Sequence, residues 1–142
     1  MAIRMNDLPP DVQKQIKSQM SERKRSKYGN KPTSRFTADN IEIKFSSQKE
    51  ARRYDELMLL LKAGQISDLR LQHSYQLQGS YTLPTGEKVK GISYVADFTY
   101  QKLHNGKYEF VCEDVKGGIL TDSYKLKKRM MADKFGIKIV EI

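Results

Sequence analysis

The pattern of apolar and polar positions predicts two neighbouring strands in the middle of the chain. Residues 92–101 and 107–116 are both rich in β-branched and aromatic side chains, which favour strands. Asn105 and Gly106 stand between them, and this pair is a strong hairpin signal because both residues tolerate positive φ. The two segments are therefore expected to form an antiparallel hairpin with a two-residue turn.

The register of this hairpin makes its acidic residues informative. Counted back from a two-residue turn, Asp97 lies directly opposite Asp114, and Lys116 shares their face because side chains alternate along a strand. Two opposed carboxylates repel unless a counter-charge is present, and a divalent cation together with the Lys116 ammonium would supply one. A three-residue turn would shift the pairing by one position and separate the two acids.

Helical spacing, capping residues and terminal glycines predict the remaining elements. Helices are expected at residues 8–27, 46–63 and 121–134. Further strands are expected at residues 41–45, 69–77 and 137–142, with loops or turns at 28–34 and 84–87. A strand, a helix and a strand at the end of the chain form a βαβ unit, so the last strand should run parallel to residues 107–116. The expected fold is α/β (α+β), with a central mixed β-sheet flanked by helices.

Net charge is distributed unevenly along the chain. Residues 1–40 carry nine basic and four acidic side chains (+5), residues 41–115 carry ten of each, and residues 116–142 carry seven and three (+4), for a total of +9. A neutral centre with basic ends suits a polyanion such as nucleic acid, although solubility alone is the alternative. We divide the chain into a basic N-terminal helix and linker, residues 1–40, and a main domain, residues 41–142.

Hydrophobicity and cysteine content favour a cytoplasmic protein. The longest apolar run, residues 57–61, is far too short to cross a bilayer, and no hydrophobic signal region is seen at the N-terminus. The single cysteine, Cys112, cannot form an internal disulfide and gives no metal-binding spacing. Cys112 lies in a predicted strand and is expected to be a small buried hydrophobe.

A third carboxylate could join the acidic pair. Glu50 follows the helical spacing of Tyr54, Leu57 and Leu61, so it stands at the end of the core-facing stripe, where a buried acid needs a partner. The alternative is a capping box in which Glu50 accepts the backbone N–H of Ser47.

The strand acids also have ordinary interpretations. Asp97 could face solvent on the open side of the sheet, and Asp114 with Lys116 could be a surface ion pair. Glu113 is the rival acid, but alternation sends it to the other face. Considered together with the register, these residues favour a site.

These motifs resemble a known superfamily. Ala96-Asp97 followed by Glu113-Asp114-Val115-Lys116-Gly117 is similar to the core signature of the PD-(D/E)XK nucleases, and residues 43–54 resemble the first helix of small phage-encoded members. The likeness covers residues 41–142, and residues 8–30 are similar as well. This sequence departs from the pattern in having Ala96 instead of proline and Asp114 where Glu is common, and neither change removes a ligand.

The resemblance implies a restriction-endonuclease-like αβββαβ core and a metal-dependent phosphodiesterase. On that basis Asp97, Asp114 and Glu50 bind Mg²⁺ or Mn²⁺, with the carbonyl of Val115 as a further ligand. All-oxygen ligation suits these hard cations. Lys116 would hold the attacking water and stabilise the transition state, and cleavage would leave a 5′-phosphate.

Two basic clusters are candidates for DNA contact. The helix at residues 121–134 carries Lys125, Lys127, Lys128 and Arg129, of which Lys125 and Lys128 are expected to contact phosphates; a merely solvated face is the alternative. The N-terminal helix ends in a second cluster, Arg23, Lys24 and Arg25, which could form a basic arm. Its apolar stripe, Val12, Ile16 and Met20, is a candidate for dimer or substrate contact.

The expected function is a Mg²⁺-dependent endodeoxyribonuclease acting on branched DNA, similar to Holliday junction resolvases. Such an enzyme would act as a homodimer, because a four-way junction needs two symmetric cuts, and would work in the cytoplasm of the host if phage-encoded. The alternatives are a non-catalytic basic nucleic-acid-binding module, which explains the charge but not the opposed acids, and a nuclease subunit of a larger replication or transposition complex.

Overall fold

The computed structural model describes residues 2–21 and 33–142, which form an α+β fold in two compact units. One unit contains residues 68–101 and 109–142 with Ala2, and the second contains residues 3–67 and 102–108. Residue 40, where the sequence suggests a boundary, lies inside the second unit, and the division at that residue stays a prediction.

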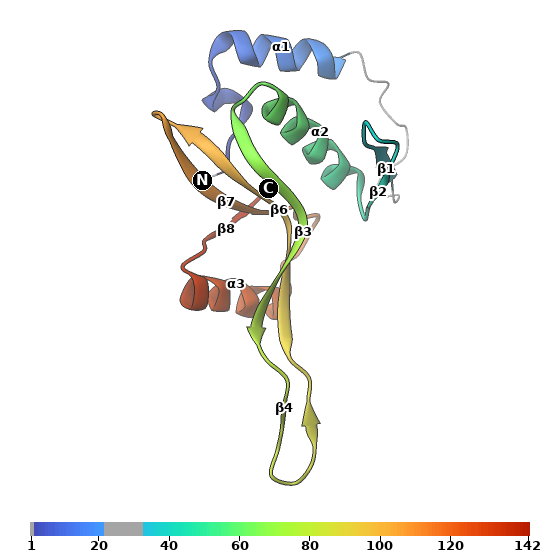
Figure 1. The fold of residues 1–142 in the computed structure, drawn as a ribbon, viewed down its shortest axis with the longest axis vertical. Coiled ribbons are helices and arrows are strands. Elements are labelled where there is room, and N and C mark those ends of the chain that lie inside the picture. The colour runs from blue at the N-terminus through green and yellow to red at the C-terminus, as the bar shows by residue number, and fades with distance from the viewer. Residues whose placement is uncertain (1, 22–32) are drawn as a thin grey trace. The chain divides into compact units, whose positions relative to one another are not determined.

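The central sheet is mixed, and its strands lie in the order β3-β6-β7-β8 (Figure 1). Their bounds are Ile66–Gln78 for β3, Ile92–His104 for β6, Lys107–Asp114 for β7 and Ile139–Glu141 for β8. Strands β7 and β8 are parallel, with Asp114 paired to Glu141. With α2 (Gln48–Lys62) before β3 and α3 (Asp122–Phe135) between β7 and β8, the chain shows the predicted αβββαβ order and the predicted parallel last strand.

The turn between β6 and β7 has the predicted length and geometry. Asn105 and Gly106 adopt φ values of 48° and 75°, so both lie in the left-handed region that a two-residue turn between twisted strands requires.

Further along β6 the alternation breaks. Phe98, Thr99 and Tyr100 are all buried. Ala96 shares a core cluster with Cys112, whereas Tyr100 donates a hydrogen bond to Glu113, the neighbour of Cys112. In a regular strand the side chains of Ala96 and Tyr100 would lie on the same face, but Cys112 and Glu113 are consecutive and lie on opposite faces. Strand β6 is therefore irregular between residues 96 and 100. The register counted from the turn therefore does not by itself fix the position of Asp97.

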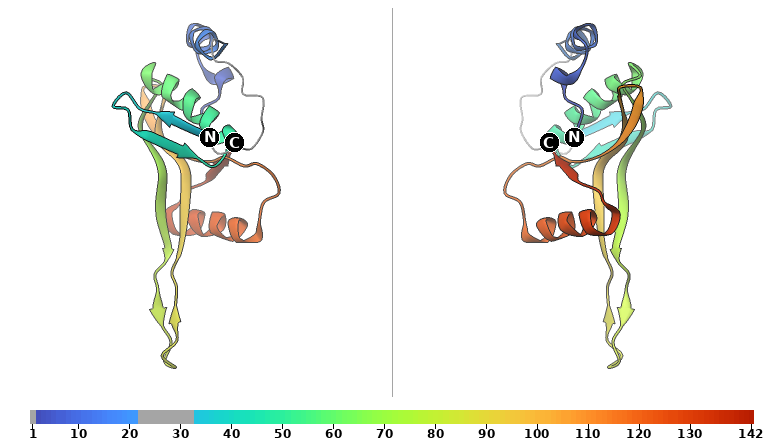
Figure 2. Two further views of the ribbon diagram at one scale, coloured as in Figure 1. Left: turned by 90° about the vertical axis from the view of Figure 1, so that its right-hand side faces the viewer. Right: turned by 90° about the vertical axis from the view of Figure 1, so that its left-hand side faces the viewer.

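Helix α3 covers one face of the sheet (Figure 2). Thr121 caps its first turn, and Gly136 ends it in the left-handed conformation, with φ of 65°, as the sequence predicts. The shared core joins α3 to all four strands of the sheet: Leu77, Tyr94, Ala96, Cys112, Tyr124, Met131 and Ile139. Apolar burial against one helix face thus fixes α3 beside the ends of β7 and β8.

The second unit contains the N-terminal helix α1 (Pro10–Ser21), the hairpin strands β1 (Thr33–Phe36) and β2 (Glu42–Phe45), and helix α2. The prediction of a loop over residues 28–34 is wrong at its end, because Thr33 and Ser34 belong to β1. Strand β1 pairs with β2 in a separate two-stranded sheet. Arg35 of β1 binds the buried Asp55 of α2 through Nε at 3.0 Å. This ion pair joins β1 to α2.

The apolar stripe of α1 is used within its own unit. Helix α1 packs against α2, and Ile16 is buried. The Ile16 part of the stripe is therefore not exposed for the predicted dimer or substrate contact. No helix among residues 2–21 and 33–142 is long and apolar enough to span a membrane.

Strands β3 and β6 continue beyond α3 as a two-stranded ribbon (Figure 1). This β4–β5 extension, residues 79–91, contains the short strands β4 (Tyr81–Thr82) and β5 (Lys88–Val89). The sequence predicted only a turn at residues 84–87, which forms the tip of the extension. The turn is therefore present, and the sequence pattern did not predict the paired strands β4 and β5 on either side of it.

Candidate active site at the end of strand β7

Asp114 is the last residue of β7 and is buried. Its Oδ2 atom accepts a hydrogen bond of 2.8 Å from the hydroxyl of Tyr94 and lies 3.1 Å from the Lys116 Nζ atom. A buried carboxylate requires such partners. The predicted association of Asp114 with Lys116 is therefore an ion pair in the structure.

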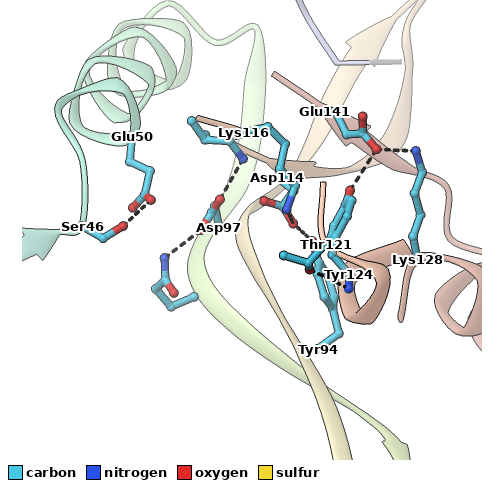
Figure 3. A network of polar contacts seen from close by, with 12 residues as sticks. Ser46, Glu50, Tyr94, Asp97, Asp114, Lys116, Thr121, Tyr124, Lys128 and Glu141 are labelled. Carbon is cyan, nitrogen blue, oxygen red and sulfur yellow. Dashed lines mark hydrogen bonds and ion pairs between the residues drawn. The ribbon is translucent and has the colours of Figure 1, made fainter. Parts of the chain in front are cut away.

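Asp97 reaches the same end of β7 from β6 (Figure 3). Its Oδ2 atom accepts a 2.8 Å hydrogen bond from the backbone N–H of Val115, the residue that directly follows Asp114. Its Oδ1 atom accepts a 3.2 Å hydrogen bond from the Gln72 side-chain amide. These contacts, rather than the strand register, bring Asp97 beside Asp114.

The Lys116 ammonium is held from a second side. Its Nζ atom lies 3.2 Å from the centroid of the Tyr124 ring, a cation–π geometry. The Tyr124 hydroxyl donates to Oε1 of Glu141 at 3.1 Å, and Lys128 donates to the same oxygen at 2.5 Å. Helix α3 and strand β8 thus support the lysine that the motif supplies.

The electrostatics reflect this gathering of acids. Burial raises the pKa of the Cys112 thiol to about 12, with further contributions from Asp114, Glu113 and Asp97 in that order. Burial and the adjacent Asp114 raise the pKa of Tyr94 well above its usual range, so its hydroxyl remains a donor. Cys112 is buried and, with this pKa, is an unreactive thiol, as expected for a small hydrophobe.

Glu113 and Glu141, the acids nearest to Asp114 on β7 and β8, lie on different faces of the sheet. Glu113 pairs with Val140, and its neighbours Cys112 and Asp114 pair with Ile139 and Glu141. Because side chains alternate along a strand, Glu113 points to the other face of the sheet from Asp114, as predicted. Its carboxylate is fully buried and accepts from the Tyr100 hydroxyl. Glu141 is on the Asp114 side, and its pKa is lowered, first by the hydrogen bond from Lys128.

Glu50 lies in the second unit, in the first turn of α2. Ser47 caps the helix by accepting from the Glu50 backbone N–H at 3.1 Å. The Glu50 carboxylate accepts from the hydroxyl of Ser46, so the reciprocal bond that the capping box predicts is replaced by one to the preceding serine. Its role as a metal ligand stays a prediction.

The donor atoms around Asp97 and Asp114 fit a hard divalent cation. Carboxylates and a nearby backbone carbonyl, that of Val115, are the oxygen ligands that Mg²⁺ and Mn²⁺ prefer, and Mg²⁺ commonly uses one or two carboxylates and retains several waters. Within residues 2–21 and 33–142, no three or more His, Cys, Asp and Glu side chains group closely enough to hold a metal ion. The fit therefore rests on the two strand carboxylates.

The basic residues predicted to bind DNA differ in exposure. Lys125 and Arg129 are exposed on α3, whereas Lys127 and Lys128 are half-buried. Lys128 is held by Glu141, which favours Lys125 over Lys128 for phosphate contact. The cluster of Arg23, Lys24 and Arg25 lies outside the described residues.

Four residues that support the site were not identified from the sequence. They are Gln72, Tyr94, Tyr124 and Glu141. Glu141 had a usable signal, because the predicted parallel strand carries one acid. The tyrosines look like core aromatics, and nothing in the local sequence marks Gln72.

Comparison with known proteins gives a family without an assigned activity. No curated protein and no solved structure shows significant similarity to the chain. Residues 25–140 match the family model DUF1064, described as a protein of unknown function. That match includes Asp97, Asp114, Lys116 and Tyr124, and the chain belongs to the DUF1064 family.

Proposed function

We propose that this protein is a metal-dependent endonuclease that hydrolyses phosphodiester bonds in branched DNA. The observation that carries the proposal is that Asp97 accepts from the backbone N–H of Val115, next to Asp114, whose carboxylate lies 3.1 Å from the Lys116 ammonium. Two acids and a lysine in this arrangement suit phosphoryl chemistry, in which a cation neutralises the phosphate and lowers the pKa of bound water. The sequence resemblance to PD-(D/E)XK nucleases supports the same assignment.

Each residue has a separate role in this proposal. Asp97 and Asp114 would hold Mg²⁺ or Mn²⁺, with the Val115 carbonyl as a further ligand. Lys116 orients the attacking water and stabilises negative charge that develops on the phosphate. Its support by Asp114 and Tyr124 favours this role because a long lysine side chain otherwise samples many rotamers.

Exposed basic residues on α3 would bind the substrate. Lys125 and Arg129 face solvent, and the chain carries a net charge of +9, so phosphate contacts should make binding salt-dependent. Replacing Lys125 by alanine is expected to weaken binding similarly for all sequences and to lower the slope of log K against log salt by about 1.

The proposal extends to the oligomeric state and the cellular compartment of the protein. A four-way junction requires two symmetric cuts, so we propose a homodimer. The single buried thiol suits a reducing cytoplasm, which would be that of the host if the protein is phage-encoded.

Cleavage of labelled DNA tests the proposal. Four-way junction, flap and linear duplex substrates are incubated with Mg²⁺, Mn²⁺ or EDTA. We expect metal-dependent cleavage of branched DNA that Asp97→Asn and Lys116→Met each reduce by at least about 100-fold. Asp133→Asn and Lys138→Met are matched controls, because both residues are exposed and away from these contacts, and both should cleave normally.

The alternatives give different results in the same assay. Tight binding without cleavage under any divalent metal would refute the enzyme and leave a nucleic-acid-binding module. Metal binding with cleavage only after a partner protein is added would indicate a subunit of a larger complex.

A further inference from the structure

Gln72 has a backbone conformation that its sequence does not favour. It lies within β3, yet its φ is 52°, in the left-handed region where residues other than glycine, asparagine and aspartate are uncommon. Such a conformation persists only when its surroundings hold it, and it is found preferentially near functional sites. A local irregularity of this kind also changes the direction of a side chain in a strand.

The Gln72 side chain contacts one candidate catalytic residue. Its Nε2 atom donates to Oδ1 of Asp97 at 3.2 Å, while the Val115 N–H donates to Oδ2 at 2.8 Å. The two carboxylate oxygens therefore receive donors from different segments, one from within β3 and one from the residue after β7. Without the Gln72 donor the carboxylate would rotate more easily about its terminal torsion, which has a broad energy profile. The bond from Gln72 therefore restricts the plane of the carboxylate.

We propose that Gln72 is a positioning residue that orients the Asp97 carboxylate, and that the left-handed backbone of β3 is kept for this purpose. The inference rests on the proposed nuclease function, to which it adds a residue outside the Asp-Asp-Lys motif. Gln72 acts through Asp97. Groups that hydrogen-bond to metal ligands commonly alter metal affinity or activity by 10–100-fold when removed.

A glycine substitution separates positioning from structural support. Gln72→Gly removes the amide and also relieves the left-handed strain, so the melting temperature should rise by about 3 °C while kcat falls about 10-fold. Gln72→Ala and Gln72→Glu remove the donor but keep the strain, so kcat should fall similarly without any gain in melting temperature. KM for DNA should change little in all three variants.

Asp68 provides the matched control. It is the second left-handed position of the same strand, with φ of 50°, and it contacts Arg70 through an exposed ion pair that contributes little. Asp68→Gly should raise the melting temperature, by less than Gln72→Gly because aspartate tolerates this conformation, and should leave kcat unchanged.

Binding of Mn²⁺, measured by titration calorimetry without DNA, adds a readout that does not depend on cleavage. The dissociation constant should rise about 10-fold in Gln72→Gly and stay unchanged in Asp68→Gly. If Gln72→Gly retains wild-type kcat and Mn²⁺ affinity, or if it loses stability together with activity, the inference is overturned. If instead the wild-type protein neither cleaves DNA nor binds Mn²⁺, the proposed function itself fails, and the positioning role fails with it.

Discussion

Replacing Tyr124 should reveal how strongly α3 holds the candidate catalytic lysine. The Lys116 Nζ atom lies 3.2 Å from the centroid of the Tyr124 ring, and the lysine side chain is 26% exposed. Cation–π contacts contribute about 0.5–1 kcal/mol at exposed sites and about 2 kcal/mol when desolvated. Partial burial therefore predicts a coupling of about 1 kcal/mol between the two side chains.

A double-mutant cycle isolates this coupling from the other losses. Tyr124→Leu also removes the hydroxyl that donates to Glu141 and reshapes a buried position, so its own loss should be about 2–3 kcal/mol. Lys116→Met removes the ion pair with Asp114 as well as the ring contact. The double variant should be less destabilised than the sum of the single variants by about 1 kcal/mol.

Urea unfolding followed by far-ultraviolet circular dichroism gives the four free energies of unfolding. Tyr124→Phe is the control, because it keeps the ring and should lose only about 1 kcal/mol for the hydroxyl. In a cycle with Lys116→Met it should show almost no coupling. If Tyr124→Leu and Lys116→Met are additive within about 0.3 kcal/mol, the ring does not hold the ammonium and the reasoning is wrong.

Three further changes test other contacts. Tyr94→Phe removes the buried donor to Asp114, so unfolding measurements should show a loss of about 1–2 kcal/mol, and the cleavage rate should fall about 10-fold; an unchanged rate would exclude an orienting role. The pKa of Glu141 is lowered from 4.5 by folding, so its stabilisation is present above that pH and is lost as pH falls through the folded-state pKa. Melting temperatures measured between about pH 3 and pH 6 should therefore fall less steeply in Glu141→Gln than in the wild type. Arg35→Ala leaves the carboxylate of Asp55 buried without its guanidinium, and urea unfolding should show a loss of about 2 kcal/mol, below the range for fully buried pairs because Arg35 is partly exposed; a loss under about 0.5 kcal/mol would contradict this view of the pair.

Local signals in the sequence were sufficient for most of the fold. Asn105-Gly106 predicted the hairpin turn because few residues accept two successive positive φ values. Thr121 and Gly136 predicted both ends of α3 because a cap and a left-handed terminus have specific residue preferences. The strand–helix–strand order then predicted the parallel β8, since the handedness of such crossovers leaves few topologies.

The parts that were missed depend on long-range contacts. Strand β1 is short and polar, and it is fixed by pairing with β2 and by Arg35 binding Asp55, which no local pattern encodes. Long-range contacts also shape part of the candidate site. Its acids and Lys116 stand in a recognisable motif, whereas the irregularity of β6 and the left-handed Gln72 arise from tertiary packing, which overrides local preference.

The β4–β5 extension is a place where the protein can be shortened or tagged. At its base, a Cβ atom on Gly91 would lie 2.7 Å from the Gln78 carbonyl oxygen and 3.0 Å from the Ser80 nitrogen, so the two backbones already touch where the ribbon leaves the sheet. A short engineered turn could join them there and remove the ribbon, while its tip, with Gly86 at φ of 88°, should accept a peptide epitope or a fluorophore tag. Loop excision and insertion could thus proceed without disturbing the strands that carry the acids.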